Sequence, residues 1–133
     1  MNNDLDSLEA IGFKKAGKWE LDGKKIKAVW DGTEEKLKNV LYAFVVDKEV
    51  KYVGKTSKTL KGRMGVYRNK GKKLLVKVRK YHDKGVYIYV LTNYDVNKEK
   101  ASSLMNDIMG LEDVLIREMS PEWNTLGKEK END

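Results

Sequence analysis

The sequence contains no cysteine and a single histidine, His82, among its 133 residues. Without cysteine the chain can form neither a disulfide framework nor a thiolate metal site. With one histidine it cannot form a zinc site built on paired histidines, nor a metal triad with two histidine ligands. A Ser-His-Asp arrangement would have to use His82, which lies in a lysine-rich segment with no nucleophile motif near it.

Long hydrophobic runs and nucleotide-binding glycine motifs are also missing. No apolar run approaches the roughly 18–20 residues that a membrane-spanning helix needs. The first residues, MNNDLDSLEA, lack the basic start and apolar stretch of a secretory signal peptide. The glycines match neither a P-loop nor the GxGxxG pattern. We therefore expect one compact, soluble domain in the cytoplasm, with no membrane partner.

Positive charge is concentrated in one part of the chain. The net charge is +6, yet residues 47–84 alone carry 14 Lys/Arg against three Asp/Glu. The remainder carries 13 Lys/Arg against 18 Asp/Glu, so it is acidic. A polyanion such as nucleic acid is the natural partner of such a basic segment. The plain alternative is a solvated, lysine-rich surface that keeps the protein soluble.

Alternation of apolar and polar residues predicts several strands rich in Val, Tyr and Phe. An Asp22-Gly23 pair between two such segments is typical of a hairpin with a type I′ turn. We expect strands at about 18–21, 24–30, 39–46, 50–54 and 86–92. A turn centred near Asp47 would make 39–46 and 50–54 antiparallel neighbours, with Tyr42 and Tyr52 directly opposite on a shared face.

Helical spacing of apolar residues and capping residues predicts the remaining elements. Thr33 is a candidate cap for one helical turn within 31–38, and a basic loop is expected at 68–73. In the last helix, Leu104, Ile108, Leu111 and Leu115 form an apolar stripe that ends before Ser120-Pro121. We expect helices at about 4–11, from Ser57 or Thr59 to Tyr67, at 72–83 before Gly85, and from Asn97 onward.

The side chains that remain for chemistry are tyrosine, lysine, arginine and glutamate, a set that suits phosphoryl transfer. Cleavage of a phosphodiester needs a base for the attacking water, a cation near the charge that develops on phosphorus, and neutralisation of the leaving oxygen. Arg63 can supply the cation, and a metal held by one carboxylate can serve the leaving oxygen. A tyrosine can act as the base only if nearby positive charge, such as Lys55, lowers its pKa from about 10.

The order and spacing of these residues resemble the GIY-YIG nuclease family over about residues 39–126. Tyr42 and Tyr52 are ten residues apart, Gly54 and Arg63 nine, Arg63 and Tyr67 four, and Glu112 and Asn124 twelve. The family pattern is a GIY-type strand, a YIG-type strand, an arginine followed one turn later by His or Tyr, a glutamate on a later helix, and an asparagine.

This sequence departs from the family pattern at some positions. Val40 and Leu41 replace the first glycine and isoleucine, and Val53 replaces the second isoleucine. Tyr67 stands where many members have histidine. The PEWN ending and the small size look most like the restriction-endonuclease branch of the family.

The resemblance implies a role for each matching residue. Tyr42 would be the general base, Tyr52 would orient the phosphate or the water, and Lys55 would assist the base or contact phosphate. Arg63 would bind the scissile phosphate, with Tyr67 as a hydrogen-bonding partner of a phosphate oxygen or water.

Glu112 would hold one Mg²⁺, or Mn²⁺, per active site through oxygen. The adjacent Asp113 points about 100° around the helix and is the poorer candidate. Gly54 and Asn124 would be structural or bind substrate. For contacts to the DNA backbone, which position DNA without reading its sequence, we select Lys58, Lys61, Arg68, Lys70, Lys72, Lys73, Lys77, Arg79 and Lys80.

The expected fold is therefore α+β, with a small central antiparallel sheet flanked by helices. Residues 1–38 would form an N-terminal helix and hairpin extension, 39–126 the catalytic domain and 127–133 a charged tail. The extension could cover the edge of the sheet, contact DNA or form a dimer surface, and we favour the first.

The expected function is metal-dependent cleavage of DNA, most simply double-stranded DNA, with a homodimer as one way to cut both strands. A non-catalytic nucleic-acid-binding module and a structure-specific repair nuclease are the alternatives.

Overall fold

A computed structural model describes residues 4–69, 72–92 and 108–124 of the chain. Its helices are α1 (Asp4–Ile11), α2 (Leu60–Asn69), α3 (Lys72–Tyr81) and α5 (Ile108–Met119). Its strands are β1 (Lys14–Asp22), β2 (Lys25–Trp30), β3 (Val40–Val46), β4 (Glu49–Thr56) and β5 (Val86–Leu91). Short 3₁₀ turns are η1 (Glu34–Lys36), η2 (His82–Lys84) and η3 (Glu122–Asn124).

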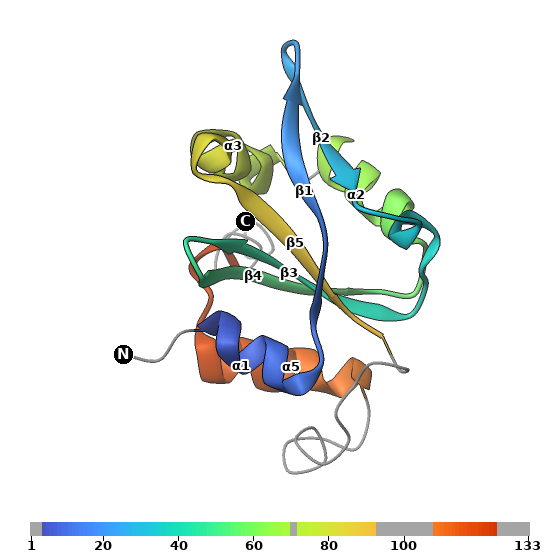
Figure 1. The fold of residues 1–133 in the computed structure, drawn as a ribbon, viewed down its shortest axis with the longest axis vertical. Coiled ribbons are helices and arrows are strands. Elements are labelled where there is room, and N and C mark those ends of the chain that lie inside the picture. Colours follow the sequence, from blue (N-terminus) through green and yellow to red (C-terminus); the bar gives the residue numbers. More distant parts are fainter. Residues whose placement is uncertain (1–3, 70–71, 93–107, 125–133) are drawn as a thin grey trace, which may run out of the picture.

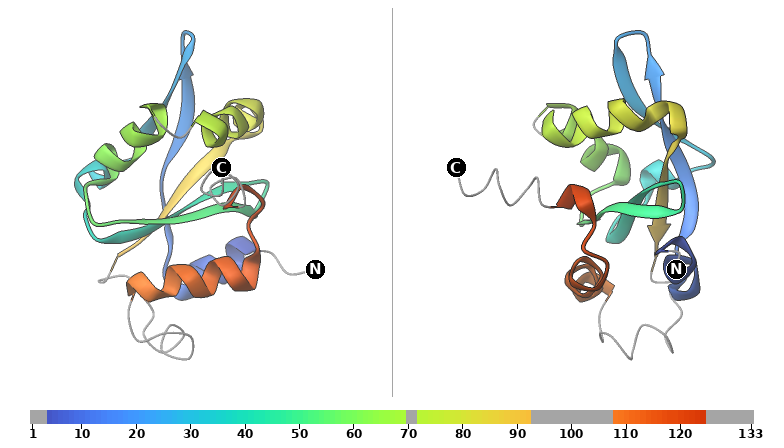
Figure 2. Two further views of the ribbon diagram at one scale, coloured as in Figure 1. Left: turned by 180° about the vertical axis from the view of Figure 1, so that it is seen from behind. Right: turned by 90° about the vertical axis from the view of Figure 1, so that its left-hand side faces the viewer.

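The five strands form one antiparallel sheet in the order β2-β1-β5-β3-β4. Helices α2 and α3 cover one face of the sheet, and α1 and α5 cover the other (Figures 1 and 2). The predicted α+β fold with a central antiparallel sheet is confirmed. Among the helices of the described segments, none is both long and apolar enough to cross a membrane.

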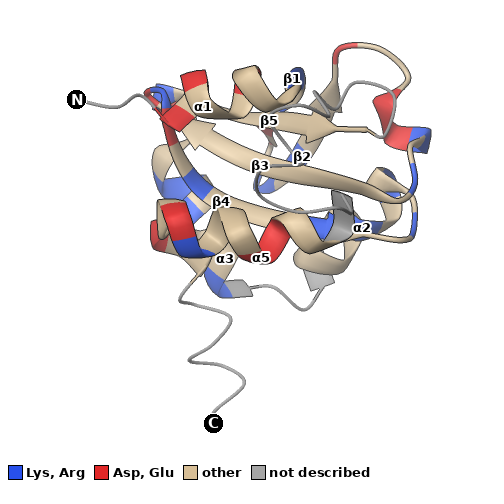
Figure 3. Cartoon of the chain, turned by 90° about the horizontal axis from the view of Figure 1, so that it is seen from below, with Lys and Arg blue, Asp and Glu red and all other residues tan. Residues whose placement is uncertain are grey.

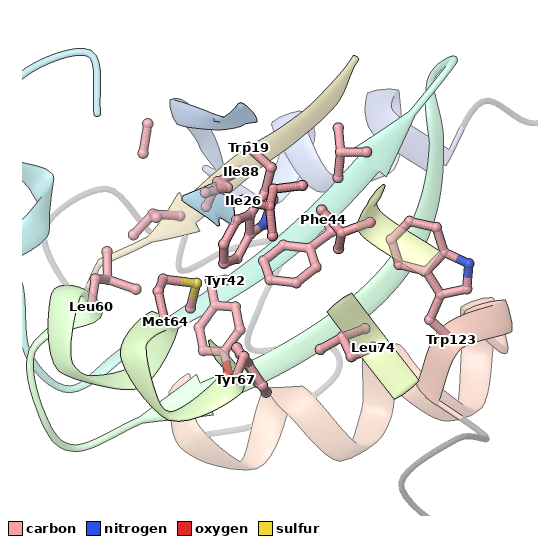
Figure 4. Close-up of a cluster of buried hydrophobic side chains, with 14 of the residues drawn as sticks. Trp19, Ile26, Tyr42, Phe44, Leu60, Met64, Tyr67, Leu74, Ile88 and Trp123 are labelled. Carbon is pink, nitrogen blue, oxygen red and sulfur yellow. Dashed lines mark hydrogen bonds between the residues drawn. The ribbon is translucent and has the colours of Figure 1, made fainter. Parts of the chain in front are cut away.

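Strand β3 lies inside the sheet and divides the core into two parts. All seven of its residues are buried and none is charged (Figure 3). Because side chains alternate along a strand, Tyr42 and Phe44 pack under α2 and α3, together with Trp19 and Trp123 (Figure 4). Leu41, Ala43 and Val45 pack on the opposite face with Leu8, Leu111 and Leu115.

Strand β1 is longer than the predicted 18–21, because it begins at Lys14 and pairs with β5 as far as Trp19. Residues of the N-terminal segment thus cover the edge of β5. Asp22 pairs with Lys25, so the hairpin turn is Gly23-Lys24, not Asp22-Gly23. Of these two turn residues only Gly23 has a positive φ, of 64°, which is the pattern of a type II′ turn and corrects the expected type I′.

The β3–β4 hairpin contains the residues on which the site prediction depends. Its turn is Asp47-Lys48, and both residues have positive φ, as a type I′ turn requires. The register then shifts between Phe44 and Val45, where Lys51 is the extra residue of β4.

This shift changes the partners of the tyrosines. Tyr42 lies opposite Gly54, and Phe44 lies opposite Tyr52. The predicted direct opposition of Tyr42 and Tyr52 is wrong, because the turn and bulge together displace the pairing by two residues. The two rings still share a face, as predicted, with their centroids 6.3 Å apart.

Capping explains where α2 begins. The Thr59 hydroxyl accepts a hydrogen bond from the Gly62 backbone N–H at 3.1 Å, as expected of an N-cap. Thr33, by contrast, makes no side-chain cap bond to η1, so that expected cap is wrong.

The predicted basic loop at 68–73 is mostly helical. Helix α2 continues to Asn69 and α3 begins at Lys72, so only residues 70–71 separate them. Helix α3 ends at Tyr81 and η2 follows, before Gly85 with φ of 92°. Strand β5 then follows nearly as predicted.

The last helix is described from Ile108 onward, so the expected start at Asn97 and the apolar Leu104 lie outside the described residues. Leu111 and Leu115 of the predicted stripe are buried. The helix ends at Met119, before Ser120-Pro121, as the sequence indicated. Ser120 has a positive φ of 46°.

Candidate active site at the edge of β4

The candidate site lies at the free edge of the sheet, beside β4. Alternation along β4 directs Gly54 toward α2 and Lys55 toward α5. Side chains from both faces can therefore meet around this edge. They line a pocket of about 490 Å³, whose walls are Lys55, Thr56, Ser57, Lys58, Arg63, Val66 and Glu112.

Three tyrosine hydroxyls and one guanidinium form a connected network on the α2 side. Arg63 Nε donates a hydrogen bond to the Tyr42 hydroxyl at 3.1 Å. The hydroxyls of Tyr42 and Tyr67 are in direct hydrogen-bond contact, and Figure 4 shows the two side chains pointing toward one another. Tyr67 donates to the Tyr52 hydroxyl at 3.1 Å. Motif residues from β3, β4 and α2 are thus brought together.

The hydrogen bonds of this network all donate in the same direction, from Arg63 through Tyr42 and Tyr67 to Tyr52. A guanidinium has no acceptor, so the Tyr42 oxygen accepts from Arg63. Because Tyr67 donates its own proton to Tyr52, Tyr42 donates its proton to Tyr67. In this arrangement Tyr42 is a neutral phenol whose proton points away from Arg63.

Burial controls the ionisation of Tyr42 and Tyr67. Desolvation raises the pKa of Tyr42 to about 12, with a further increase from Tyr52, although Arg63 opposes both. Burial also raises the pKa of Tyr67. The expectation that Lys55 would lower the pKa of Tyr42 is wrong, because the cation beside Tyr42 is Arg63 and its effect is smaller than that of burial.

Lys55 instead faces Glu112 of α5. Its Nζ lies 3.8 Å from Glu112 Oε1, and the glutamate side chain is only 15% exposed. Burial raises the pKa of Glu112, and Lys55 partly offsets this effect. Asp113 is exposed and does not line the pocket, in keeping with its position around the helix.

Glu112 could offer one carboxylate to a hard cation, so the protein would fill only part of the coordination shell of that ion. Within the described ranges, no three His, Cys, Asp or Glu side chains cluster in a way that could enclose a metal ion. Glu112 would therefore be a single carboxylate ligand. Mg²⁺ commonly keeps several waters and binds through one or two carboxylates plus substrate phosphates, so the half-buried Glu112 suits Mg²⁺ or Mn²⁺ better than a closed structural site.

Gly54 and Asn124 support the site by packing and by hydrogen bonding. A Cβ on Gly54 would lie 2.5 Å from both Cζ and Oη of Tyr42, so only glycine leaves room for that ring. The Asn124 side chain accepts from the Val53 N–H and donates to the Val53 carbonyl, both at 2.9 Å. It thereby satisfies the backbone of the edge strand beside the pocket.

The predicted DNA-backbone residues are dispersed. Lys58 lines the pocket, and Lys61 is exposed on α2. On α3, Lys73 and Lys80 are exposed and Lys77 is half-buried. Arg79 Nη2 donates to the Lys24 carbonyl at 2.8 Å. Lys70 and the side chains of Arg68 and Lys72 lie outside the described part of the chain.

Three residues of the pocket wall were not predicted to have a functional role: Thr56, Ser57 and Val66. Thr56 and Ser57 directly follow Lys55 where β4 ends, and Val66 lies one helical turn after Arg63. Their positions next to Lys55 and one turn after Arg63 are the sequence signal that could have indicated a place in the pocket wall.

The fold is a five-stranded antiparallel sheet with helices on both faces, and this class of fold has a counterpart among solved structures. The chain is similar to the structure of the bacteriophage T4 EndoII E118A mutant, with a TM-score of 0.61 and 21% sequence identity. The match covers 92% of this chain and 98% of that chain. No protein-family model and no curated protein matches the sequence. At this identity the similarity shows a shared fold.

Proposed function

We propose that this chain is a metal-dependent DNA endonuclease of the GIY-YIG type. The observation that carries the proposal is the convergence of Arg63 and Glu112 on one pocket. They reach it from opposite faces of the sheet, around the edge of β4. A cation and a carboxylate on either side of an open pocket are what a phosphodiester and its metal ion require.

Arg63 would hold the scissile phosphate. Its Nε is engaged with Tyr42, and its terminal nitrogens belong to a side chain that lines the pocket. A guanidinium remains charged and presents a planar donor fork that matches two phosphate oxygens. The bond to Tyr42 would fix the orientation of that fork and keep the phosphate next to the tyrosine hydroxyl.

Tyr42 would accept the proton of the attacking water. It can do so only as a phenolate, and burial keeps it protonated near neutral pH by raising its pKa to about 12. Its proton would pass to Tyr67 while Tyr67 gives its own proton to Tyr52 and Tyr52 releases one to solvent, and Arg63 would stabilise the phenolate that remains on Tyr42. Tyr52, which is half-buried, completes the chain of hydroxyls.

Glu112 would bind the metal ion, which when bound supplies positive charge at the leaving oxygen. Lys55 lies beside that carboxylate, so its ammonium would compensate the charge of Glu112 before the metal arrives. It could then contact a phosphate oxygen of the substrate. Lys58, on the same pocket wall, would contact a neighbouring phosphate.

DNA is the proposed substrate because of the basic segment and the shared fold with a phage endonuclease. One site of this kind cuts one strand in each event. Cleavage of both strands would need either a dimer or two successive events.

A non-catalytic nucleic-acid-binding module is the second candidate. The observations that favour it are the protonated, fully buried Tyr42 and the pairing of Glu112 with Lys55. A repair nuclease that prefers branched DNA would share the chemistry and differ only in substrate.

One experiment separates these candidates. The protein is incubated with plasmid and with branched DNA, with Mg²⁺ and with EDTA. We expect EDTA-sensitive cleavage that Arg63→Ala and Glu112→Ala each abolish, while Asp113→Ala, an exposed change next to Glu112 on the same helix and outside the pocket, retains it. Binding without cleavage by the wild type would favour the binding module, and full activity of both alanine variants would refute the assigned site.

A further inference from the structure

The β1–β2 hairpin extends beyond the sheet as a two-stranded ribbon. Strand β1 pairs with β5 only as far as Trp19, whereas its pairing with β2 continues to Asp22 and Lys25. Among the described residues, 20–27 therefore have no third strand beside them. Figures 1 and 2 show the tip of this ribbon projecting past the neighbouring helices. All residues of the ribbon except Ile26 are exposed.

The tip of the ribbon carries positive charge. Asp22 and Lys27 form an exposed ion pair at 3.5 Å. Lys24 and Lys25 at the turn are exposed and form no ion pair with any described residue. Leu21 beside them is 40% exposed, whereas every other leucine that the structure describes is less exposed. The tip thus combines two available cations with an apolar side chain.

The ribbon is fastened to the basic helix α3. Arg79 Nη2 donates to the Lys24 carbonyl at 2.8 Å, so the turn of the hairpin is held at the end of that helix. No residue of α3 is acidic, and Lys73 and Lys80 are exposed on it. Ribbon and helix thus place the exposed Lys24, Lys25, Lys73 and Lys80 on elements that do not line the candidate pocket.

We propose that this ribbon enters the major groove of duplex DNA, with Lys24 and Lys25 on backbone phosphates. The inference rests on the proposed nuclease function and adds a second DNA-binding element away from the scissile phosphate. A two-stranded β-ribbon fits the major groove, which is about 12 Å wide. Leu21 is placed for apolar contact with base edges, such as a thymine methyl group.

The test measures duplex binding in EDTA, which prevents cutting, by fluorescence anisotropy with a 30-base-pair duplex over a range of salt concentrations. Each lysine bound to a phosphate adds about 0.9 to the slope of log affinity against log salt. At 0.1 M salt that slope corresponds to about eightfold in affinity for each such lysine. We expect Lys24→Ala/Lys25→Ala to bind about 8- to 60-fold more weakly, depending on whether one or both lysines bind phosphate, with a slope reduced by about 1 to 2.

The control is Lys38→Ala/Lys48→Ala, which removes the same charge from exposed positions on other elements. It should bind within about twofold of the wild type. A second variant, Glu20→Lys, adds a cation to the exposed ribbon and should bind more tightly with a steeper slope.

The outcomes distinguish this inference from the proposed function. Wild-type protein that neither binds nor cuts DNA would refute both. Wild-type protein that cuts, with Lys24→Ala/Lys25→Ala and Glu20→Lys matching its affinity and slope, would refute the role of the ribbon alone. Equal weakening in the ribbon and control variants would also overturn it, because general charge would then explain binding.

Discussion

Gly54 is the position at which the structure most sharply limits the choice of residue, so Gly54→Ala is a stringent test. The new Cβ would lie 2.5 Å from Cζ and Oη and 2.8 Å from Cε2 of Tyr42, whose side chain is fully buried. The ring must move, and with it the hydrogen bond from Arg63. The φ of Gly54 is not positive, so the backbone itself would accept alanine.

The expected magnitude follows from three effects. Overpacking of a buried side chain costs about 1–3 kcal/mol, and the displaced hydrogen bond adds about 1 kcal/mol. Replacement of a strand glycine recovers about 0.5–1 kcal/mol. We therefore expect Gly54→Ala to lower the free energy of unfolding by about 2 kcal/mol, measured by urea denaturation with tryptophan fluorescence.

Gly65→Ala is the matched control. Gly65 lies inside α2, and a Cβ there would meet no atom within 4 Å. Alanine should stabilise that helix by about 1 kcal/mol, so the two glycine variants should differ by about 3 kcal/mol. In a Tyr42→Leu background, which lacks the clashing ring atoms, the cost of Gly54→Ala should largely disappear. Wild-type stability of Gly54→Ala, or the same cost in both backgrounds, would refute the packing described here.

Three further predictions follow from the charges and hydrogen bonds of the site. Burial raises the pKa of the Glu112 carboxyl in the folded protein. Its ionisation as pH rises through this raised pKa therefore lowers the free energy of unfolding. Glu112→Gln should therefore melt at a higher temperature than the wild type at pH 7 and at the same temperature below pH 4. Mg²⁺ should not raise the melting temperature of this variant. A lower melting temperature than the wild type at pH 7 would contradict the prediction. Asn124→Ala leaves the Val53 N–H and carbonyl without their partner and should cost about 1–3 kcal/mol in urea denaturation, whereas Thr33→Ala, which loses no cap bond, should cost less than about 0.5 kcal/mol. Since the pKa of Tyr42 is about 12, its phenolate fraction, and with it kcat/KM, should rise about tenfold per pH unit between pH 7 and 9, and a flat profile would show that Tyr42 is not the base.

The arrangement of strands could be predicted only where the signal is local. The apolar run of β3 and the turn that follows identify the central hairpin. The bulge at Lys51 has no local signal, because it depends on the pairing of two whole strands, and it displaced the expected partner of Tyr42. The first half of β1 was missed for a similar reason, since Ala16 and Gly17 are weak strand formers and the strand is stabilised by β5, about 70 residues later.

The candidate site could be predicted as a set of residues but not as a set of interactions. The spacing of Tyr42, Arg63 and Glu112 indicated which residues would converge. Arg63 and Glu112 line the pocket, and Tyr42 accepts a hydrogen bond from Arg63. The partner of Lys55 was assigned incorrectly, although strand alternation places Lys55 and Gly54 on opposite faces. Burial of Tyr42, which determines its pKa, depends on α2 and α3 closing over the sheet.

The central claim is that Arg63 and Glu112 act as one unit on a single phosphate across the edge of β4. Single-turnover cleavage of a duplex oligonucleotide in Mg²⁺ tests it, with Arg63→Ala, Glu112→Ala and the double variant compared. Residues that act together on one transition state are strongly non-additive, so we expect each single variant to lose most of the rate and the double variant to be no slower than the slower single one. Wild-type rates in either single variant, or rate reductions that multiply in the double variant, would contradict the claim.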